Sequence, residues 1–352
     1  MNALVPDGYA CPAFSISDVF LAGKEKYVIS QIRPADIDAV SGLTFPAFRP
    51  HLTRCLSGEV HDGFESIAQV ARHDGIPVGL LLAQSPAVAA SNCGDLPSPK
   101  VAKLLSVSIL PAWRQRGVAF RLMRAIETEL RERDYIGLTA DYTTLMPAWQ
   151  PFERLLAACH WSAPDPRLLM SKGYCREVVK APWLDALREL PSDFEMFEWT
   201  QLRTDERSQL QHDEAEGSIP YVLSPFTETQ DIEPTISVGV RHRGEVVAWM
   251  IVTRAPLVPN ALCYRSTFVR PDLRAAQALG PMILAAALRR HAASPIADTR
   301  PVGVFGMSFD SSIKMINFFR KRLAPYCFST YESRASVKML GSPAQADQTP
   351  RA

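Results

Sequence analysis

The stretch from Leu104 to Leu130, LLSVSILPAWRQRGVAFRLMRAIETEL, constrains the fold of this chain more than any other. Its first part is an apolar run with small polar interruptions, and it ends at Pro111, which has no donor for a sheet ladder. Its last part repeats an apolar residue every four positions, with arginines and glutamates between, at Val118, Leu122, Ile126 and Leu130. The pattern predicts a buried strand, a tight turn and an amphipathic helix.

The turn between this strand and this helix reads RQRGVA, from Arg114 to Ala119. Gly117 and Ala119 leave the backbone open to close approach. The first amides of a helix have no partner inside it, and the aligned peptide dipoles favour negative charge there. A pyrophosphate fits such a site. On the glycine spacing alone, an ordinary turn with solvated arginines is an equally good interpretation.

The complete motif, from the strand through the turn to the helix, decides between these interpretations. The order of a strand, Ile109-Leu110-Pro111, the RQRGVA turn and an amphipathic helix resembles the central motif of the GNAT family of acyl-coenzyme A-dependent N-acyltransferases. The resemblance implies that backbone amides in the turn hold the pyrophosphate of acetyl-CoA or another acyl-CoA, without a metal, and that the strand edge pairs with the pantetheine. The cofactor-binding residues implied are Val107, Ser108, Ile109, Arg114, Gln115, Arg116, Gly117, Val118, Ala119 and Phe120.

Length and composition set further limits. A chain of 352 residues predicts two domains. Lys and Arg number 38 against 37 Asp and Glu, so the basic excess of a nucleic-acid-binding protein is missing. The seven cysteines are scattered without a Cys-x-x-Cys pair, which favours reduced thiols over disulfides or a zinc site. With no leader pattern and no long apolar run, we expect a cytoplasmic protein without membrane contact.

The second half of the chain repeats the first. A predicted hairpin at 67–82 turns at Asp74-Gly75, and one at 236–251 turns at Arg243-Gly244. A strand that ends at Pro271, a helix and the strand Val302–Met307 then follow in the earlier order. The sequence therefore predicts an α/β protein of two tandem GNAT-like domains, each a mixed, mostly antiparallel sheet flanked by helices.

The predicted boundaries are an N-terminal arm at 1–24, a first domain at 25–172, a linker at 173–192, a second domain at 193–340 and a tail at 341–352. Leu168–Lys172 is expected to close the first domain and Tyr331–Met339 the second. In the second domain the glycine of the turn comes late, at Gly280, and Pro281 removes an amide donor. Its phosphate site is therefore predicted to be damaged.

A tandem pair of domains can imitate a dimer within one chain, so the sequence leaves the oligomeric state open between a monomer and a homodimer.

The resemblance also implies a chemistry. In GNAT enzymes a neutral amine attacks the thioester directly, and a strand amide, here at Ile109 or a neighbour, stabilises the oxyanion. The family commonly places a tyrosine in the last helix, but the aligned position holds Leu156, and the second domain offers Phe318. The candidate catalytic residues that remain are Asp141 and Tyr142, whose alternative interpretation is a turn cap and a half-buried tyrosine.

Glu153 and His160 are weaker candidates, and Cys159 is expected in the core. The function implied is an N-acyltransferase that moves an acyl group, most simply acetyl, from acyl-CoA to an amine of a small molecule or peptide. Residues 45–63, between the first two strands, would cover this acceptor. Two alternatives stay open. One is an acyltransferase for longer chains that uses acyl-CoA or an acyl-carrier thioester, and the other is a non-catalytic CoA-binding module.

Overall fold

A computed structural model describes residues 27–61, 63–86, 100–187, 189–226, 231–254, 258, 260–274, 278–311 and 313–341. The predicted arm at 1–24 and almost all of the predicted tail lie outside these residues. The chain divides into two compact units. Unit 1 comprises Met1–Tyr142, Met146–Asp165 and Arg334–Ala352, and unit 2 comprises Thr143–Leu145 and Pro166–Ser333. In the part of the chain that is described, no helix is long and apolar enough to cross a membrane.

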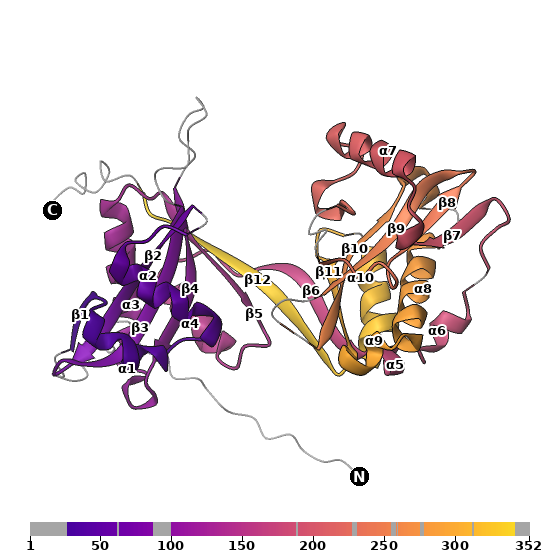
Figure 1. Cartoon of the computed structure of the whole chain (residues 1–352). Helices are drawn as coiled ribbons and strands as arrows, with labels where there is room; N and C mark the ends of the chain where they lie inside the picture. Colours follow the sequence, from indigo (N-terminus) through magenta and orange to yellow (C-terminus); the bar gives the residue numbers. More distant parts are fainter. Residues whose placement is uncertain are drawn as a thin grey trace, which may run out of the picture. The chain divides into compact units, whose positions relative to one another are not determined.

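Unit 1 is built on a mixed sheet (Figure 1). Its strands, in spatial order, are β1 (Tyr27–Gln31), β2 (Phe64–His73), β3 (Ile76–Pro86), β4 (Val101–Ile109), β5 (Gly137–Thr143) and the second part of β12 (Ser329–Met339). The pairs from β1 to β4 are antiparallel, whereas β4 and β5 are parallel. The prediction of a mixed, mostly antiparallel sheet is confirmed.

Helices cover both faces of this sheet. On one face α1 (Ile37–Ser41) and α2 (Arg49–Ser57) pack over β2 and β3 through Val40 and Leu52. On the other face lie α3 (Val118–Glu132) and α4 (Trp149–Ala158). The four apolar residues that repeat along α3 are all at most 1% exposed, which confirms the predicted amphipathic helix. The short helices η2 (Pro34–Asp36), η3 (Pro46–Phe48) and η4 (Pro111–Trp113) begin with proline.

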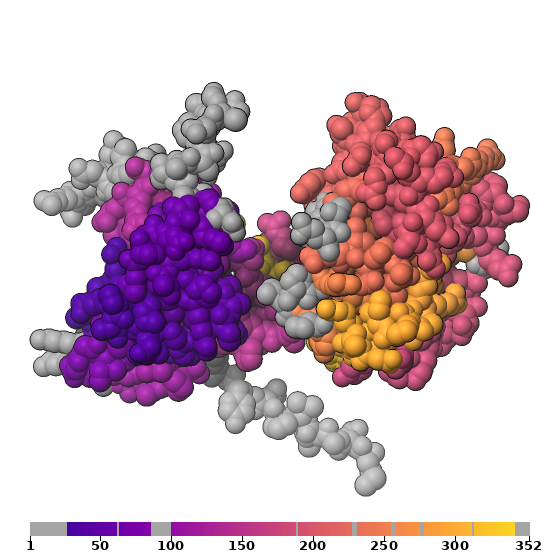
Figure 2. Space-filling model, in the orientation of Figure 1, coloured from indigo at the N-terminus to yellow at the C-terminus, as the bar shows by residue number. Residues whose placement is uncertain are grey.

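Unit 2 has the same plan. After the first part of β12, its strand order is β6 (Asp165–Tyr174), β11 (Val302–Ser308), β10 (Ala261–Val269), β9 (Glu245–Arg254), β8 (Val238–His242) and β7 (Phe194–Glu198). Its helices are α5 (Cys175–Val178), α6 (Pro182–Asp185), α7 (Thr204–Ala215), α8 (Leu279–Ala293), α9 (Ile296–Thr299), α10 (Ile313–Phe318) and the π-helix η9 (Phe319–Leu323). The 3-10 turns are η5 (Trp199–Gln201), η6 (Tyr221–Leu223), η8 (Pro271–Leu273) and η10 (Ala324–Tyr326). The polar helix α7 lies on the surface of unit 2 (Figure 2).

The internal repeat extends to backbone detail. Both predicted hairpins turn over two residues of positive φ, at 49° and 82° for Asp74 and Gly75 and at 51° and 88° for Arg243 and Gly244. These angles define the turn that matches strand twist in a two-residue hairpin. The register of β4 against β3 shifts between Leu104 and Ser106, and that of β10 against β9 shifts between Tyr264 and Ser266. Equivalent strands therefore carry equivalent bulges.

The closing strands differ from the predicted domain boundaries. Leu168–Lys172 belongs to β6, which pairs antiparallel with β11 and lies in unit 2. The part of β12 from Arg334 onwards lies in unit 1, where the N–H of Ser162 donates to the carbonyl of Val337 at 2.8 Å. The predicted linker at 173–192 holds α5 and α6, whose Val178 and Leu184 are fully buried. Strand propensity identifies these segments but does not specify their partners, which are distant in sequence.

A buried ion pair also recurs in both units. In unit 1 the guanidinium of Arg72 on β2 binds Asp36, and each residue is 4% exposed. In unit 2 Arg241 on β8 binds Glu206 on α7, with Nε 2.6 Å from Oε1. Burial alone would raise the pKa of either carboxyl, but the arginine hydrogen bonds outweigh it and the pKa is lowered. The pair fixes η2 onto the sheet in unit 1 and α7 onto the sheet in unit 2.

Unit 2 buries a neutral histidine, and this predicts how its stability depends on pH. His291 Nε2 lies 2.8 Å from the carbonyl of Arg300, which only accepts, so Nε2 carries the proton and Tyr264 donates to Nδ1 at 3.1 Å. Burial lowers the pKa of His291. The folded state therefore binds fewer protons than the unfolded state, whose histidine titrates near pH 6.5. We expect the unfolding free energy of unit 2 to be constant above that pH and to fall below it.

Denaturant unfolding at pH 5 and pH 7.5 measures this change. The variant His291→Gln keeps a polar side chain but cannot titrate, so its stability should lose part of the pH dependence. A difference between the two pH values that is the same in the wild type and the variant would assign the effect to other groups.

Candidate active site

The two central strands of unit 1 separate partway along their length. β4 and β5 are in register from Val101↔Gly137 to Leu104↔Ala140, and β4 then continues to Ile109 without a further described partner on β5. The N–H of Leu110 donates to the carbonyl of Val78 on the β3 side at 2.9 Å. Since backbone groups alternate along a strand, the N–H groups of Ile109 and Val107 point to the opposite edge. This edge is the one that the separation opens.

The start of α3 lies directly beyond this edge. Gly117 is the N-cap with φ 75°, a left-handed conformation that only glycine adopts without strain. Its carbonyl accepts the first intrahelical bond, from the N–H of Arg121 at 3.0 Å. The N–H groups of Val118, Ala119 and Phe120 therefore have no acceptor within the helix, and no side chain caps them. A Cβ on Gly117 would find only the Tyr27 hydroxyl within 4 Å, at 3.9 Å.

Positive charge surrounds these amides. Arg114, Arg116 and Arg121 are exposed, and Arg121 lies over the ring of Tyr27 with 4.9 Å to the ring centroid. Arg114 also fixes the turn, because its Nε donates to the carbonyl of Ile109 at 3.1 Å. The helix dipole adds to the field of the arginines. The arrangement suits a ligand that carries a diphosphate at one end and an extended chain at the other. All ten predicted cofactor-binding residues lie on this edge, on the turn or in the first turn of α3.

The structure places the two predicted catalytic residues on opposite faces of β5. Leu138, Ala140 and Tyr142 point into the core under α3 and α4, so Asp141 points to the face that α1 and α2 cover. The Asp141 carboxylate is 51% exposed and lies 2.7 Å from Nζ of Lys103. The two residues are adjacent in sequence and do not form one pair. Their positions suit separate roles on the two sides of the opening.

Tyr142 is buried at 7% exposure, and its hydroxyl donates to Oε1 of Glu153 at 2.7 Å. Burial and then the Glu153 carboxylate raise the pKa of Tyr142. Nη1 of Arg334 donates to the same oxygen at 2.8 Å. Leu156, where the family motif has a tyrosine, is buried core at 1% exposure. Because Glu153 lies one turn before Leu156, the hydroxyl of Tyr142 reaches the helix turn that the missing tyrosine would occupy.

Sequence reasoning missed two residues of unit 1, one on each face of the sheet. Arg334 comes from β12, 181 positions after its partner Glu153, and no local signal marks it. His51 on α2 lies 2.8 Å from the Ser66 hydroxyl through Nδ1, on the face of the sheet that Asp141 shares. Burial, with Arg54 and His61 nearby, lowers the pKa of His51, so it is neutral at pH 7. Residues 45–63 show no sustained apolar periodicity, so the sequence does not indicate this helix or its histidine.

Unit 2 lacks the equivalents of the site residues. The last paired residues of its central strands are Tyr264↔Phe305, so Gly306 and Met307 take the positions of Asp141 and Tyr142. On β10, Phe268 takes the position of Ser108 and stacks on Trp249 with ring centroids 4.3 Å apart. The polar side chains of Ser108, Asp141 and Tyr142 in unit 1 are therefore replaced in unit 2 by phenylalanine, glycine and methionine.

The helix start of unit 2 is also changed. Ala278 is the N-cap of α8, and its carbonyl accepts the N–H of Met282 at 3.1 Å. Pro281 then takes the position of Phe120 and has no N–H, while Met282 replaces Arg121. Arg274 still donates to the carbonyl of Val269 at 2.8 Å, as Arg114 does to that of Ile109. The hydrogen bond of Arg114 is therefore retained in unit 2, but the Phe120 amide and the Arg121 cation have no counterparts.

The separated central strands and the uncapped helix start of unit 1 define an α/β protein in which free helix amides lie beside the end of the central strand. Residues 38–156 match the sequence model of the Acetyltransferase (GNAT) family. A comparison with curated protein sequences gave no match. No group of three or more His, Cys, Asp or Glu that could hold a metal ion occurs among the described residues.

Two solved structures resemble the chain over most of its length. One is a tandem GNAT protein from the clavulanic acid biosynthesis pathway, with a TM-score of 0.51, 16% identity, and coverage of 90% of this chain and 99% of that chain. The other contains the glucosamine N-acetyltransferase region of a fungal multi-domain β-N-acetylglucosaminidase, with a TM-score of 0.51, 15% identity, and coverage of 90% of this chain and 38% of that chain. Residues 38–156 of the chain therefore form a GNAT acetyltransferase domain, and the two units together resemble the fold of a tandem GNAT protein, as predicted.

Proposed function

We propose that this protein is an N-acyltransferase that moves an acyl group, most simply acetyl, from acyl-CoA to an amine of a small molecule or peptide. The observation that carries the proposal is the uncapped start of α3 beside the open edge of β4. Unit 1 has both features together with polar side chains at the opening. Unit 2 has the opening but lacks the amide of Pro281 and the counterparts of Asp141 and Tyr142.

The donor site follows from the backbone. The amides of Val118, Ala119 and Phe120 are free to donate to a diphosphate, and Gly117 allows it to approach closely. The edge from Val107 to Ile109 offers N–H and C=O groups to the amides of a pantetheine arm. In the same strand the N–H of Ile109 or Val107 would stabilise the oxyanion that forms as an amine attacks the thioester carbonyl. These donors are held in place by the sheet before any ligand binds.

Two proton transfers complete the proposed reaction. The acceptor ammonium must lose a proton before it can attack as a neutral amine, and Asp141 faces the side from which an acceptor covered by α1 and α2 would arrive. His51, neutral and oriented by Ser66 on that face, is a second proton acceptor, through water. The departing thiolate needs a proton donor, and Tyr142 supplies a hydroxyl on the opposite face. Arg334 would hold Glu153 so that this hydroxyl keeps its orientation.

Release of free thiol from acetyl-CoA and from longer acyl homologues, measured with a panel of amines, tests the proposal. We expect thiol release that depends on the amine and is fastest with a short acyl group. Fastest release with long acyl groups would support the longer-chain enzyme. Tight binding of CoA without amine-dependent release from any donor would overturn the proposed activity and support a non-catalytic module.

Removal of the Tyr142 hydroxyl provides a test of one residue. The change Tyr142→Phe should lower kcat roughly 100-fold, which is the lower range for a general acid, and leave KM for acetyl-CoA nearly unchanged. Steady-state kinetics at saturating amine measures both quantities. Tyr135→Phe is the matched control, because Tyr135 is also buried and also donates to a glutamate, Glu65, at 3.1 Å. If kcat is the same in Tyr142→Phe and the wild type, the hydroxyl has no part in turnover.

A further inference from the structure

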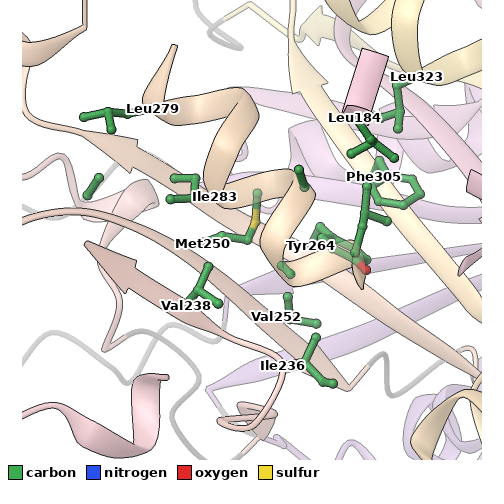
Figure 3. Close-up of a cluster of buried hydrophobic side chains, with 14 of the residues drawn as sticks. Leu184, Ile236, Val238, Met250, Val252, Tyr264, Leu279, Ile283, Phe305 and Leu323 are labelled. Carbon is green, nitrogen blue, oxygen red and sulfur yellow. The ribbon is translucent and has the colours of Figure 1, made fainter. Parts of the chain in front are cut away.

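Unit 2 contains a partly open apolar cavity of about 60 Å³ at the place where its central strands separate. β10 and β11 stop pairing at Tyr264↔Phe305, and the cavity lies beyond them, against Gly280 and Pro281 in the first turn of α8. Figure 3 shows Met250 between this helix and the sheet, with the rings of Tyr264 and Phe305 close together. The π-helix η9 closes another side, and such helices are frequent at functional sites.

The lining indicates what the cavity can accept. Three methionines, Met250, Met307 and Met315, contribute flexible thioethers that adapt to apolar shapes. The hydroxyl of Thr267 is directed to Sδ of Met250 at 3.5 Å, and that of Tyr264 is bonded to His291. No charged side chain lines the cavity in the described part of unit 2. A charged group would lose its hydration there without compensation.

The helix start beside the cavity lacks two groups that could hold a nucleotide. The cavity is the counterpart of the slot that the thioester chain would occupy in unit 1, but Pro281 and Met282 have removed an amide and a cation from the adjoining helix start. A volume of about 60 Å³ corresponds to about four water-sized atoms. The slot has therefore kept room for a short chain and has lost groups that would hold a diphosphate.

We infer that unit 2 binds the alkyl end of a short unbranched chain of about four carbons in this cavity, without the nucleotide of CoA. The inference concerns unit 2 and stands apart from the activity proposed for unit 1. Such a chain can come from a free carboxylic acid, an alcohol or an acyl thioester. The shared chemistry is an unbranched alkyl group that contacts the methionine side chains.

Methyl NMR of the full chain labelled at methionine tests the inference, with n-butanol, butyrate, butyryl-CoA and CoA as probes. We expect n-butanol to shift the methyl signals of Met250, Met307 and Met315 with saturation, and to leave Met123 of unit 1 in place. If butyrate or butyryl-CoA produces the same shifts, that compound is identified as a source of the alkyl chain. Absence of saturable shifts with all the alkyl probes, or shifts of the three methyls by CoA alone, would overturn the inference.

A cavity-filling variant makes the test specific. In Gly280→Leu the new Cβ would lie 4.0 Å from Cγ2 of Val269, an ordinary contact, and the side chain would enter the cavity. We expect this variant to fold and to lose the n-butanol shifts. Ala293→Leu, an exposed change at the end of the same helix, should keep them. Shifts that persist unchanged in Gly280→Leu would place the binding elsewhere.

Discussion

Replacement of Gly117 by glutamate should lower the affinity for CoA by about 100-fold or more in calorimetric titration. A carboxylate at the start of α3 would lie within about 5 Å of a bound diphosphate, where like charges at an effective dielectric constant near 20 repel by about 3 kcal/mol. Each 1.4 kcal/mol costs a factor of 10 in affinity. The left-handed φ of 75° at Gly117 adds strain for any side chain, about 1–2 kcal/mol.

Two further variants separate these effects. Gly117→Ala introduces the strain without the charge, so it should lose less affinity than Gly117→Glu. Gly280→Glu makes the same change in the first turn of α8, at a glycine without positive φ, and should leave the affinity for CoA nearly unchanged. Equal losses for Gly117→Glu and Gly280→Glu would contradict the assignment of the nucleotide to unit 1 alone.

Replacement of Arg72 by methionine should destabilise unit 1 by about 3–5 kcal/mol, the usual cost of leaving one charge of a buried pair without its partner. Arg72 binds Asp36 and also donates to the carbonyl of Gln31 at 3.0 Å, and Asp36 is 4% exposed. In the variant the carboxylate would keep the N–H of Arg33, at 2.7 Å, as its hydrogen-bond donor in η2. Denaturant unfolding followed by hydrogen exchange of each unit measures the loss and its location.

The double variant Arg72→Met with Asp36→Leu should recover most of the lost stability, because both buried charges are then absent. Arg241→Met should produce the corresponding loss in unit 2, through Glu206. If Arg72→Met costs less than about 1 kcal/mol, or if its loss appears in unit 2, then the ion pair does not fix the first helical segment of unit 1 to the sheet.

The features that could be predicted from the sequence are those that depend on neighbouring residues. The hairpins at Asp74-Gly75 and Arg243-Gly244 follow from local turn chemistry, and α3 follows from its four-residue apolar spacing. The uncapped start of α3 could also be predicted, because the exposure of its backbone amides depends on one glycine. The placement of Asp141 and Tyr142 on opposite faces follows from the alternation of side chains along β5.

The remaining features depend on pairing between distant segments. The sequence shows that 168–172 and 331–339 are strands, but which sheet edge each one joins is decided by long-range contacts. The contact of Arg334 with Glu153 depends on that same pairing. The sequence does not indicate helix α7 for a different reason. This helix is charged on almost every side and buries only Glu206 and Leu210. No apolar stripe marks a helix that is held mainly by an ion pair.

Amide hydrogen exchange with and without CoA tests the proposed anion site most directly. When CoA binds, exchange should slow at Val118, Ala119 and Phe120, whose N–H groups would donate to the diphosphate, and should stay unchanged at Leu279, Gly280 and Met282 of α8. Unchanged exchange at the start of α3 in a protein saturated with CoA, or slowed exchange at α8 instead, would contradict the account.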